Sequence, residues 1–440
     1  MVHIFGALGR SFALDVESGN LFELDAEAAK VLSGLTANGW NTEAVADSDI
    51  VREFVALRCD GQLDSAEADV APPSDPGVIK AMCLNVAHDC NLRCRYCFAG
   101  QGEYNNSSCN TRMPLDVGIA ALEFLMKRSG NRRNLEVDFF GGEPLLNFDN
   151  VRRMVEAGRE LERKYNKKIS FTMTTNAAGV TDEIADWINA EMDNCVLSID
   201  GRREVHDRMR PDAGGHGSYD KCAAGALRVV SGRGGKAYYA RGTYTAHNLD
   251  FHLDALALAD AGFANVSVEP VVAQSDKPYA LNEAMLPEIF ASYDKLAEEI
   301  VKRSKGASTG KPFTFFHFIT SGEHEPCLRK RLMGCGAGNE YAAVTPDGDI
   351  YPCHQFVGRE SFRMGNVIAD ELDSATQKEF ASVNILTKSE CRKCWAKYHC
   401  GGGCAANAHS ANGDIRLPDK LSCAFMKKRL ELALAMSADE

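Results

Sequence analysis

Three cysteines have the spacing expected of a cluster held by a single loop. The segment HDCNLRCRYCF carries Cys90, Cys94 and Cys97 directly after the strand-like run VIKAMCLNVA (78–87). Three thiolates on a four-iron cube leave one iron free to bind a small molecule, and the potentials of such clusters reach low enough for reductive chemistry. The spacing therefore predicts a cluster that binds and reduces a ligand. A zinc site that uses two or three of these thiolates is the alternative.

A second group of cysteines lies in the last quarter of the chain. Sixteen cysteines would be unusual as disulfides in a chain with no export signal, because the cytosol keeps thiols reduced. Metal or cluster ligation is the better explanation, although Cys-x2-Cys pairs also occur in zinc ribbons. The candidate ligands of this region are Cys327, Cys335, Cys353, Cys391, Cys394, Cys400, Cys404 and Cys423.

The first cysteine loop resembles that of radical S-adenosylmethionine enzymes, and the tetrapeptide GGEP one β/α unit later strengthens the likeness. The resemblance implies that Cys90, Cys94 and Cys97 are catalytic cluster ligands, and that the open iron binds S-adenosylmethionine and generates a 5′-deoxyadenosyl radical. Glu143 would accept a hydrogen bond from the ammonium of this ligand. The pocket residues that the resemblance implies are Gly141, Gly142, Glu143, Pro144, Thr174, Thr175, Asn176, Ser198, Asp200, Arg210 and Arg241. For the last seven, ordinary capping of strand ends is the alternative.

The cysteine pattern from residue 335 onward resembles the SPASM extension of radical enzymes that modify peptides. By this resemblance, one auxiliary cluster is held by Cys391, Cys394, Cys400 and Cys423. Another is held by Cys335, Cys353 and Cys404, with either Cys327 or a substrate thiolate as the fourth ligand. The cofactors implied are S-adenosylmethionine and three 4Fe-4S clusters.

Strand-like and helical runs alternate between residues 76 and 309, which predicts an α/β fold with a partial (β/α)6 TIM-like barrel. The strand-like runs are VIKAMCLNVA, VDFF, ISFTMTT, CVLSID, KAYYARGTYT and NVSVEPVV. The helical runs are PLDVGIAALEFLMKR, FDNVRRMVEAGRELERKY, YDKCAAGALRVVS and 281–303. The candidate pocket residues lie toward the carboxyl ends of the strands, where parallel β/α folds place their active sites.

The first 75 residues are expected to form a separate module. FALDVESGNLFELD predicts two strands around a turn, and DAEAAKVLSGL predicts a helix. This order resembles the RiPP recognition element, a winged-helix-like domain that binds leader peptides, and an exposed strand edge suits pairing with an extended peptide. A purely structural cap is the alternative. The expected domains are 1–75, a linker APPSDPG (71–77), the barrel over 76–309, and a Cys-rich SPASM domain over 310–440.

The auxiliary clusters suggest the reaction. A carbon radical that joins a thiolate releases one electron, which a nearby cluster can accept, and coordination keeps a thiol deprotonated. YPCHQFVG resembles maturases of six-cysteine SCIFF peptides (ranthipeptides), which implies thioether crosslinks in a ribosomally made Cys-rich peptide. Relatives that make formylglycine carry Asp where this chain has His354. This histidine is either a substitute base or a residue that orients the cluster loop.

Other outcomes remain open: formylglycine formation, carbon–carbon crosslinking, or a non-catalytic iron–sulfur electron carrier. The implied partners are a precursor peptide with its leader and a reducing donor such as flavodoxin or ferredoxin. A net charge of −12 argues against nucleic acid or anionic membrane as a partner. Without a membrane-spanning apolar run, a cytoplasmic protein is expected.

Overall fold

The computed structural model describes residues 1–440 except 45–47, 68, 72–76, 105–110, 321–327 and 439–440. Two of the predicted features therefore lie outside the described residues: the candidate ligand Cys327 and most of the linker 71–77. None of the described helices is both long and apolar enough to cross a membrane.

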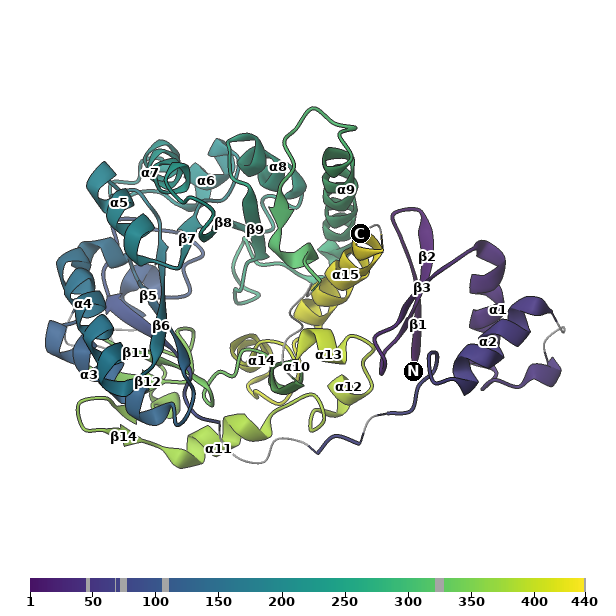
Figure 1. The fold of residues 1–440 in the computed structure, drawn as a ribbon. Helices are drawn as coiled ribbons and strands as arrows, with labels where there is room; N and C mark the ends of the chain where they lie inside the picture. The colour runs from purple at the N-terminus through teal and green to yellow at the C-terminus, as the bar shows by residue number, and fades with distance from the viewer. Residues whose placement is uncertain (45–47, 68, 72–76, 105–110, 321–327, 439–440) are drawn as a thin grey trace.

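Six parallel strands form the centre of the molecule and pair with one another in chain order (Figure 1). They are β4 (Ala81–Ala87), β5 (Asn134–Gly141), β6 (Lys168–Thr175), β7 (Asn194–Ser198), β8 (Ala237–Tyr244) and β9 (Asn265–Pro270). The helices along this part of the chain are α3 (Leu115–Arg128), α4 (Phe148–Tyr165), α5 (Asp182–Glu191), α6 (Arg203–Met209), α7 (Tyr219–Ser231), α8 (His252–Asp260) and α9 (Leu286–Ser304). The predicted α/β fold with a parallel sheet is confirmed.

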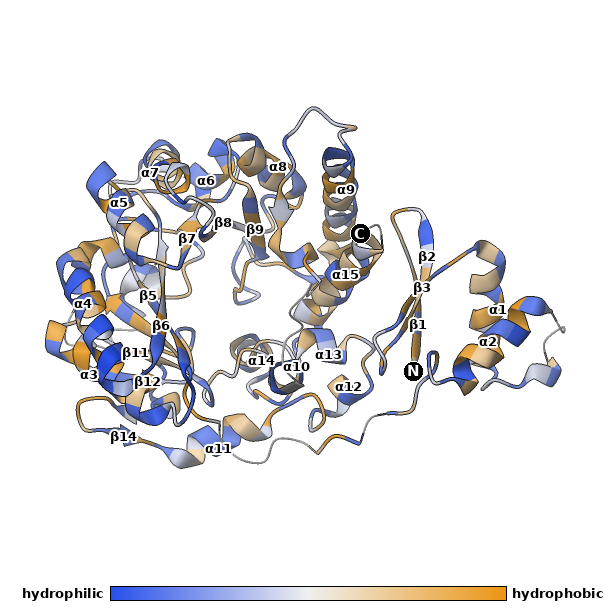
Figure 2. Cartoon of the chain, viewed as in Figure 1, coloured by the Kyte–Doolittle hydropathy of each residue, from blue (hydrophilic) through white to orange (hydrophobic). Residues whose placement is uncertain are grey.

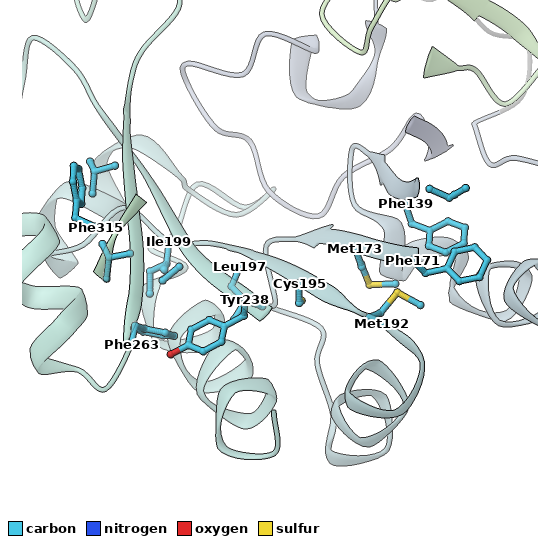
Figure 3. Packing of buried hydrophobic residues seen from close by; sticks show 14 of the residues in the cluster. Phe139, Phe171, Met173, Met192, Cys195, Leu197, Ile199, Tyr238, Phe263 and Phe315 are labelled. Atoms are coloured by element: carbon cyan, nitrogen blue, oxygen red, sulfur yellow. The ribbon is translucent and has the colours of Figure 1, made fainter. Parts of the chain in front are cut away.

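Alternation along the strands separates a packed face from a polar face. In β6, Ile169, Phe171 and Met173 are buried beneath the helices, and Figure 3 shows Phe171 and Met173 in this layer with Phe139 and Leu197. Outer helices such as α3 and α4 carry both hydrophobic and hydrophilic residues (Figure 2), as expected of helices with one buried face. The opposite face of the strands is left for polar side chains.

The carboxyl-terminal segment adds strands to the same sheet. Strand β10 (Thr314–Phe315) pairs with β9, and β11 (Tyr341–Val344) pairs in parallel with β4. Beyond β11 follow β12 (Asp349–Tyr351), β13 (Gly365–Asn366) and β14 (Glu371–Leu372). The remaining elements are α10 (Leu328–Met333), α11 (Ser374–Ser382), α12 (Ser389–Arg392), α13 (Lys397–Cys400), α14 (Ala405–Asn412) and α15 (Lys420–Ser437). The sheet therefore continues across the expected boundary at residue 310.

The amino-terminal unit is a small sheet between two layers of helix. Its strands are β1 (Val2–Ala7), β2 (Arg10–Asp15) and β3 (Leu21–Leu24), followed by α1 (Ala26–Ala37) and α2 (Asp49–Cys59). One face, with Ala13, packs with Leu32 and Phe54 of these helices. The other face, with Phe5 and Phe12, joins the main core near α15 (Figure 1). The unit therefore packs against α15 of the carboxyl-terminal segment.

Candidate active site

The first cysteine loop lies at the carboxyl end of the parallel sheet, directly after β4. Its backbone is fixed from outside the loop, since the Arg93 N–H donates to the Pro211 carbonyl at 2.7 Å and the Arg95 N–H to the Met209 carbonyl at 2.8 Å. Burial raises the pKa of the Cys90 and Cys94 thiols to about 12. At neutral pH these thiols therefore lose their protons only when a metal binds, as cluster ligands do.

A cavity of about 210 Å³, open to solvent, lies against this loop. Most of the expected pocket residues line it: Cys90, Cys94, Cys97, Gly141, Gly142, Thr174, Thr175, Asn176, Ser198, Arg210, Arg241 and His354. Lining residues that sequence reasoning did not single out include Tyr96, Phe140, Thr243, Glu269 and Gln355. The structure thus brings residues from β5 to β9, from the cysteine loop, from the end of α6 and from the loop of His354 around one space.

The glycines of GGEP allow two loops to touch. A Cβ on Gly141, whose φ is +130°, would lie 2.3 Å from the Ala87 carbonyl oxygen, and one on Gly142 would lie 2.1 Å from that of Asp89. The Gly142 N–H donates to Ala87 O at 2.7 Å and the Glu143 N–H to Asp89 O at 2.9 Å. Because only glycine fits here, the end of β5 is held against the start of the cysteine loop.

Glu143 and Pro144 do not line the cavity. The Glu143 carboxylate is 1% exposed and accepts hydrogen bonds from Thr175 Oγ1 at 2.6 Å and from the Asn176 N–H at 2.8 Å. Asn176 in turn donates from Nδ2 to Asn91 Oδ1, at 2.7 Å, inside the cysteine loop. Pro144 begins a buried helical turn that ends at Asn147. In this structure Glu143 orders the pocket walls.

Asp200 also lies behind the cavity wall. Its fully buried carboxylate accepts from Arg210 Nε at 3.0 Å, from the Tyr96 hydroxyl at 2.6 Å and from the Thr243 N–H at 3.0 Å. Arg210 lines the cavity, and its Nη1 lies 4.0 Å from Cys94 Sγ. Asp200 therefore positions a cation beside the cluster loop.

His354 forms part of the cavity wall between two aromatic rings. Its ring centroid lies 5.3 Å from that of Phe98 and 5.0 Å from that of Phe140, and Nδ1 lies 3.4 Å from the Tyr341 hydroxyl. Burial lowers the pKa of His354 to about 4, so the imidazole is uncharged at neutral pH. A group with this pKa is a weak proton acceptor at pH 7.

Asp138, which sequence reasoning missed, is better suited to accept a proton. It lies two residues before Phe140 in β5, and Thr174 Oγ1, which lines the cavity, donates to its carboxylate at 3.4 Å. Burial raises the pKa of Asp138 to about 7. The available signal was an aspartate between the apolar Val137 and Phe139 of a strand, where a polar residue must face the opposite side.

The described cysteines after residue 330 gather in two groups. In the first group, Cys353 lies close enough to Cys404 and Cys335 for their charges to interact. In the second, Cys423 interacts in the same way with Cys400, Cys391 and Cys394. These groups are the two sets that the SPASM resemblance implies. Lys388, 5% exposed, interacts with members of both.

Cysteine thiolates are the ligands of iron–sulfur clusters and also occur in zinc sites. Within the described part of the chain, no three His, Cys, Asp or Glu side chains converge on a position for one metal ion. Zinc requires its ligand atoms about 2 Å from a single ion, whereas a cluster distributes its thiolates over separate irons. Of the cysteines outside these groups, Cys83, Cys195 and Cys222 are buried, as expected of inert thiols, and Cys59 is exposed.

Comparisons with known proteins agree with this arrangement. Residues 76–222 match the family model of a 4Fe-4S single cluster domain, and residues 335–395 match SPASM, an iron–sulfur cluster-binding domain. The chain is 22% identical over 439 residues to the radical SAM cyclopropyl synthase TigE of Paramaledivibacter caminithermalis, covering 93% of this chain and 89% of the relative.

Two further likenesses concern maturation enzymes. A cysteine-type anaerobic sulfatase-maturating enzyme of Clostridium novyi is 24% identical over 343 residues, covering 72% of this chain and 86% of the relative. The structure of native anSMEcpe with bound AdoMet and the Cp18Cys peptide has a TM-score of 0.65 at 20% identity, covering 82% of this chain and 98% of that one, and so shows the same fold. The chain belongs to the radical S-adenosylmethionine enzymes with a SPASM domain, whose cofactors are S-adenosylmethionine and iron–sulfur clusters.

Proposed function

We propose that this enzyme forms thioether crosslinks from cysteines to acceptor carbons in a ribosomally made, Cys-rich peptide. The observation that carries the proposal is a pair of neighbouring cavities that lie between the two cysteine regions and share part of their lining. The cavity at the first loop shares Arg241, Glu269 and Gln355 with a second cavity of about 240 Å³. The second cavity reaches Cys400, Cys404 and Cys423. A peptide bound across both places an acceptor carbon near one cluster site and a thiol near the other.

The proposed ligands follow the two resemblances. Cys90, Cys94 and Cys97 would hold the cluster that binds S-adenosylmethionine, and the two later groups would hold auxiliary clusters. When bound, the first cluster and its cosubstrate supply a 5′-deoxyadenosyl radical that removes one hydrogen atom from the peptide. Joining the carbon to sulfur then releases the thiol proton and one electron, which an auxiliary cluster would accept, so two hydrogens leave the peptide for each link.

The protein's own residues orient and deprotonate the peptide in this proposal. Phe98 and His354 give the cavity an apolar wall. Thr174 connects the cavity to the Asp138 carboxylate. With a pKa of about 7, this carboxylate is partly ionised at neutral pH and accepts, by way of the Thr174 hydroxyl, the proton that crosslinking releases.

Replacing Asp138 with asparagine is expected to lower the crosslinking rate by about 100-fold or more. In the unmodified enzyme the rate should rise as the pH increases through about 7, because the ionised carboxylate is the active form. In the variant this rise should disappear, while 5′-deoxyadenosine still forms. Liquid chromatography–mass spectrometry of both products from pH 6 to 8.5 checks this. An unchanged pH profile in D138N would exclude the role, and exposed Asp220→Asn is the matched control.

The amino-terminal unit is proposed to bind the leader of the peptide. Its outer strands β1 and β3 have no strand partner on their free edges within the described residues, so an extended segment can add to the sheet. Adding a saturating leader peptide is expected to slow hydrogen exchange of backbone amides in β1 or β3, because these groups gain partners. Exchange measured by mass spectrometry would contradict the proposal if protection appeared only outside residues 2–24.

The product distinguishes the proposed reaction from its rivals. A thioether removes two hydrogens and leaves no thiol to alkylate. A carbon–carbon link also removes two hydrogens, but every cysteine can still be alkylated. Formylglycine formation from cysteine loses the sulfur. Mass spectrometry of the peptide before and after alkylation, using the anaerobically reconstituted enzyme, therefore assigns the reaction.

A further inference from the structure

We propose that the amino-terminal unit completes the second auxiliary-cluster site, with Glu17 and His3 as positioning residues for the loop between Cys394 and Cys400. This inference rests on the cluster ligands assigned under the proposed function and does not depend on thioether formation. Five residues, Trp395 to His399, separate the two cysteines. Three of their side chains contact the amino-terminal unit.

Glu17, in the turn after β2, holds two of these residues. Lys397 Nζ lies 2.6 Å from Glu17 Oε1, and the pair is enclosed, since the side chains are 1% and 5% exposed. The Tyr398 hydroxyl donates to Glu17 Oε2 at 2.9 Å. Separating a buried ion pair would leave a charge without its partner away from water, which costs free energy. The two side chains are therefore held together. Glu17 therefore fixes the middle of the loop from more than 370 residues away in sequence.

His3 of β1 holds the start of the loop. Its ring stacks on Trp395, next to Cys394, with centroids 3.7 Å apart and planes 7° apart. Its Nε2 lies 3.0 Å from Glu431 Oε1 of α15. The same helix carries Cys423, the most distant of the four proposed ligands. His3 thus bridges two chain segments that supply thiols to one cluster.

The loop faces the thiols on its other side. Lys397 lines a cavity of about 650 Å³ together with Cys391, Cys394, Cys400 and Cys423. Docking of the amino-terminal unit and assembly of this cluster therefore stabilise the same loop conformation. By linkage, each strengthens the other. Because Glu17 lies four residues before β3, a leader bound at that edge would act on the cluster through this turn.

The test uses Glu17→Gln and His3→Ala in full-length protein whose three loop cysteines, Cys90, Cys94 and Cys97, are alanine. Electron paramagnetic resonance then reports only the auxiliary clusters. Both variants are expected to bind less iron and to show an altered signal. E17Q should also raise the midpoint potential, because it removes a negative charge and leaves Lys397 only the more exposed Glu67, 3.9 Å away, which favours the reduced cluster. Glu23→Gln removes a more exposed ion pair with Arg10 and should change neither property.

Hydrogen exchange supplies a second measurement that does not depend on iron. Residues 395–399 and β1 should both exchange faster in E17Q and H3A than in E23Q. If β1 is loosened but iron content, spectrum and potential stay unchanged, the unit is only a structural neighbour and the proposal is wrong. If the parent protein shows no auxiliary-cluster signal, the ligand assignment fails, and this inference fails with it. Peptide and cosubstrate are absent throughout, so the outcome is independent of the crosslinking reaction.

Discussion

Replacing Cys94 with alanine is expected to reduce 5′-deoxyadenosine formation to background, a loss of more than about 100-fold. Changes to residues that merely support metal ligands cost about 10- to 100-fold, so loss of a ligand itself costs more. Cys94 is the middle thiol of the loop, and its Sγ lies 4.0 Å from the Arg210 guanidinium. Anaerobic reconstitution with iron and sulfide, followed by mass spectrometry after adding S-adenosylmethionine and a strong reductant, measures the effect.

Cys59→Ala is the matched control, because this cysteine is exposed and belongs to neither cysteine region. It should retain full 5′-deoxyadenosine formation and full iron content. C94A should lose only the iron of the first cluster and keep the auxiliary signals. Wild-type-like turnover by C94A would show that the first cysteine loop is not required for 5′-deoxyadenosine formation.

Asp200→Asn is expected to destabilise the protein by about 3–5 kcal/mol, the cost of breaking a buried ion pair by removing one partner. Asp200 is fully buried, and Arg210 is 8% exposed. The change leaves the guanidinium without its counter-charge and also weakens the hydrogen bond from the Tyr96 hydroxyl. Because Arg210 lines the cavity, binding of S-adenosylmethionine should weaken as well. Denaturant unfolding and isothermal titration calorimetry measure the two effects.

The exposed pair of Asp220 and Arg203 provides the comparison. Its side chains are 75% and 55% exposed, so Asp220→Asn should leave stability nearly unchanged. Equal effects of the two substitutions on the free energy of unfolding would mean that burial of the Asp200–Arg210 pair adds nothing to its contribution to stability. A double variant with Arg210→Met and Asp200→Asn should recover part of the stability, because no buried charge is then left alone.

Local sequence patterns predicted those helices and strands whose formation depends on residues close by in the sequence. The helical run 148–165 is found in full as α4, and 219–231 as α7, because amphipathic spacing is a property of one segment. Strand β1 was not predicted, although Leu8 and Gly9 turn the chain with φ values of 52° and 74°. Strand β11 was also not predicted, since its four residues form a strand only beside β4.

By itself, the sequence determined which residues can bind a cluster, because ligand spacing within a loop is local chemistry. It also indicated that the pocket lies at the carboxyl ends of the strands. Only the tertiary structure decided that Glu143 and Asp200 lie behind the cavity wall. It also decided that Asp138 contacts the cavity residue Thr174, and that Glu17 forms an ion pair with Lys397. The reason is physical: these contacts join segments far apart in the chain, and their charges are tolerated only where packing supplies a partner.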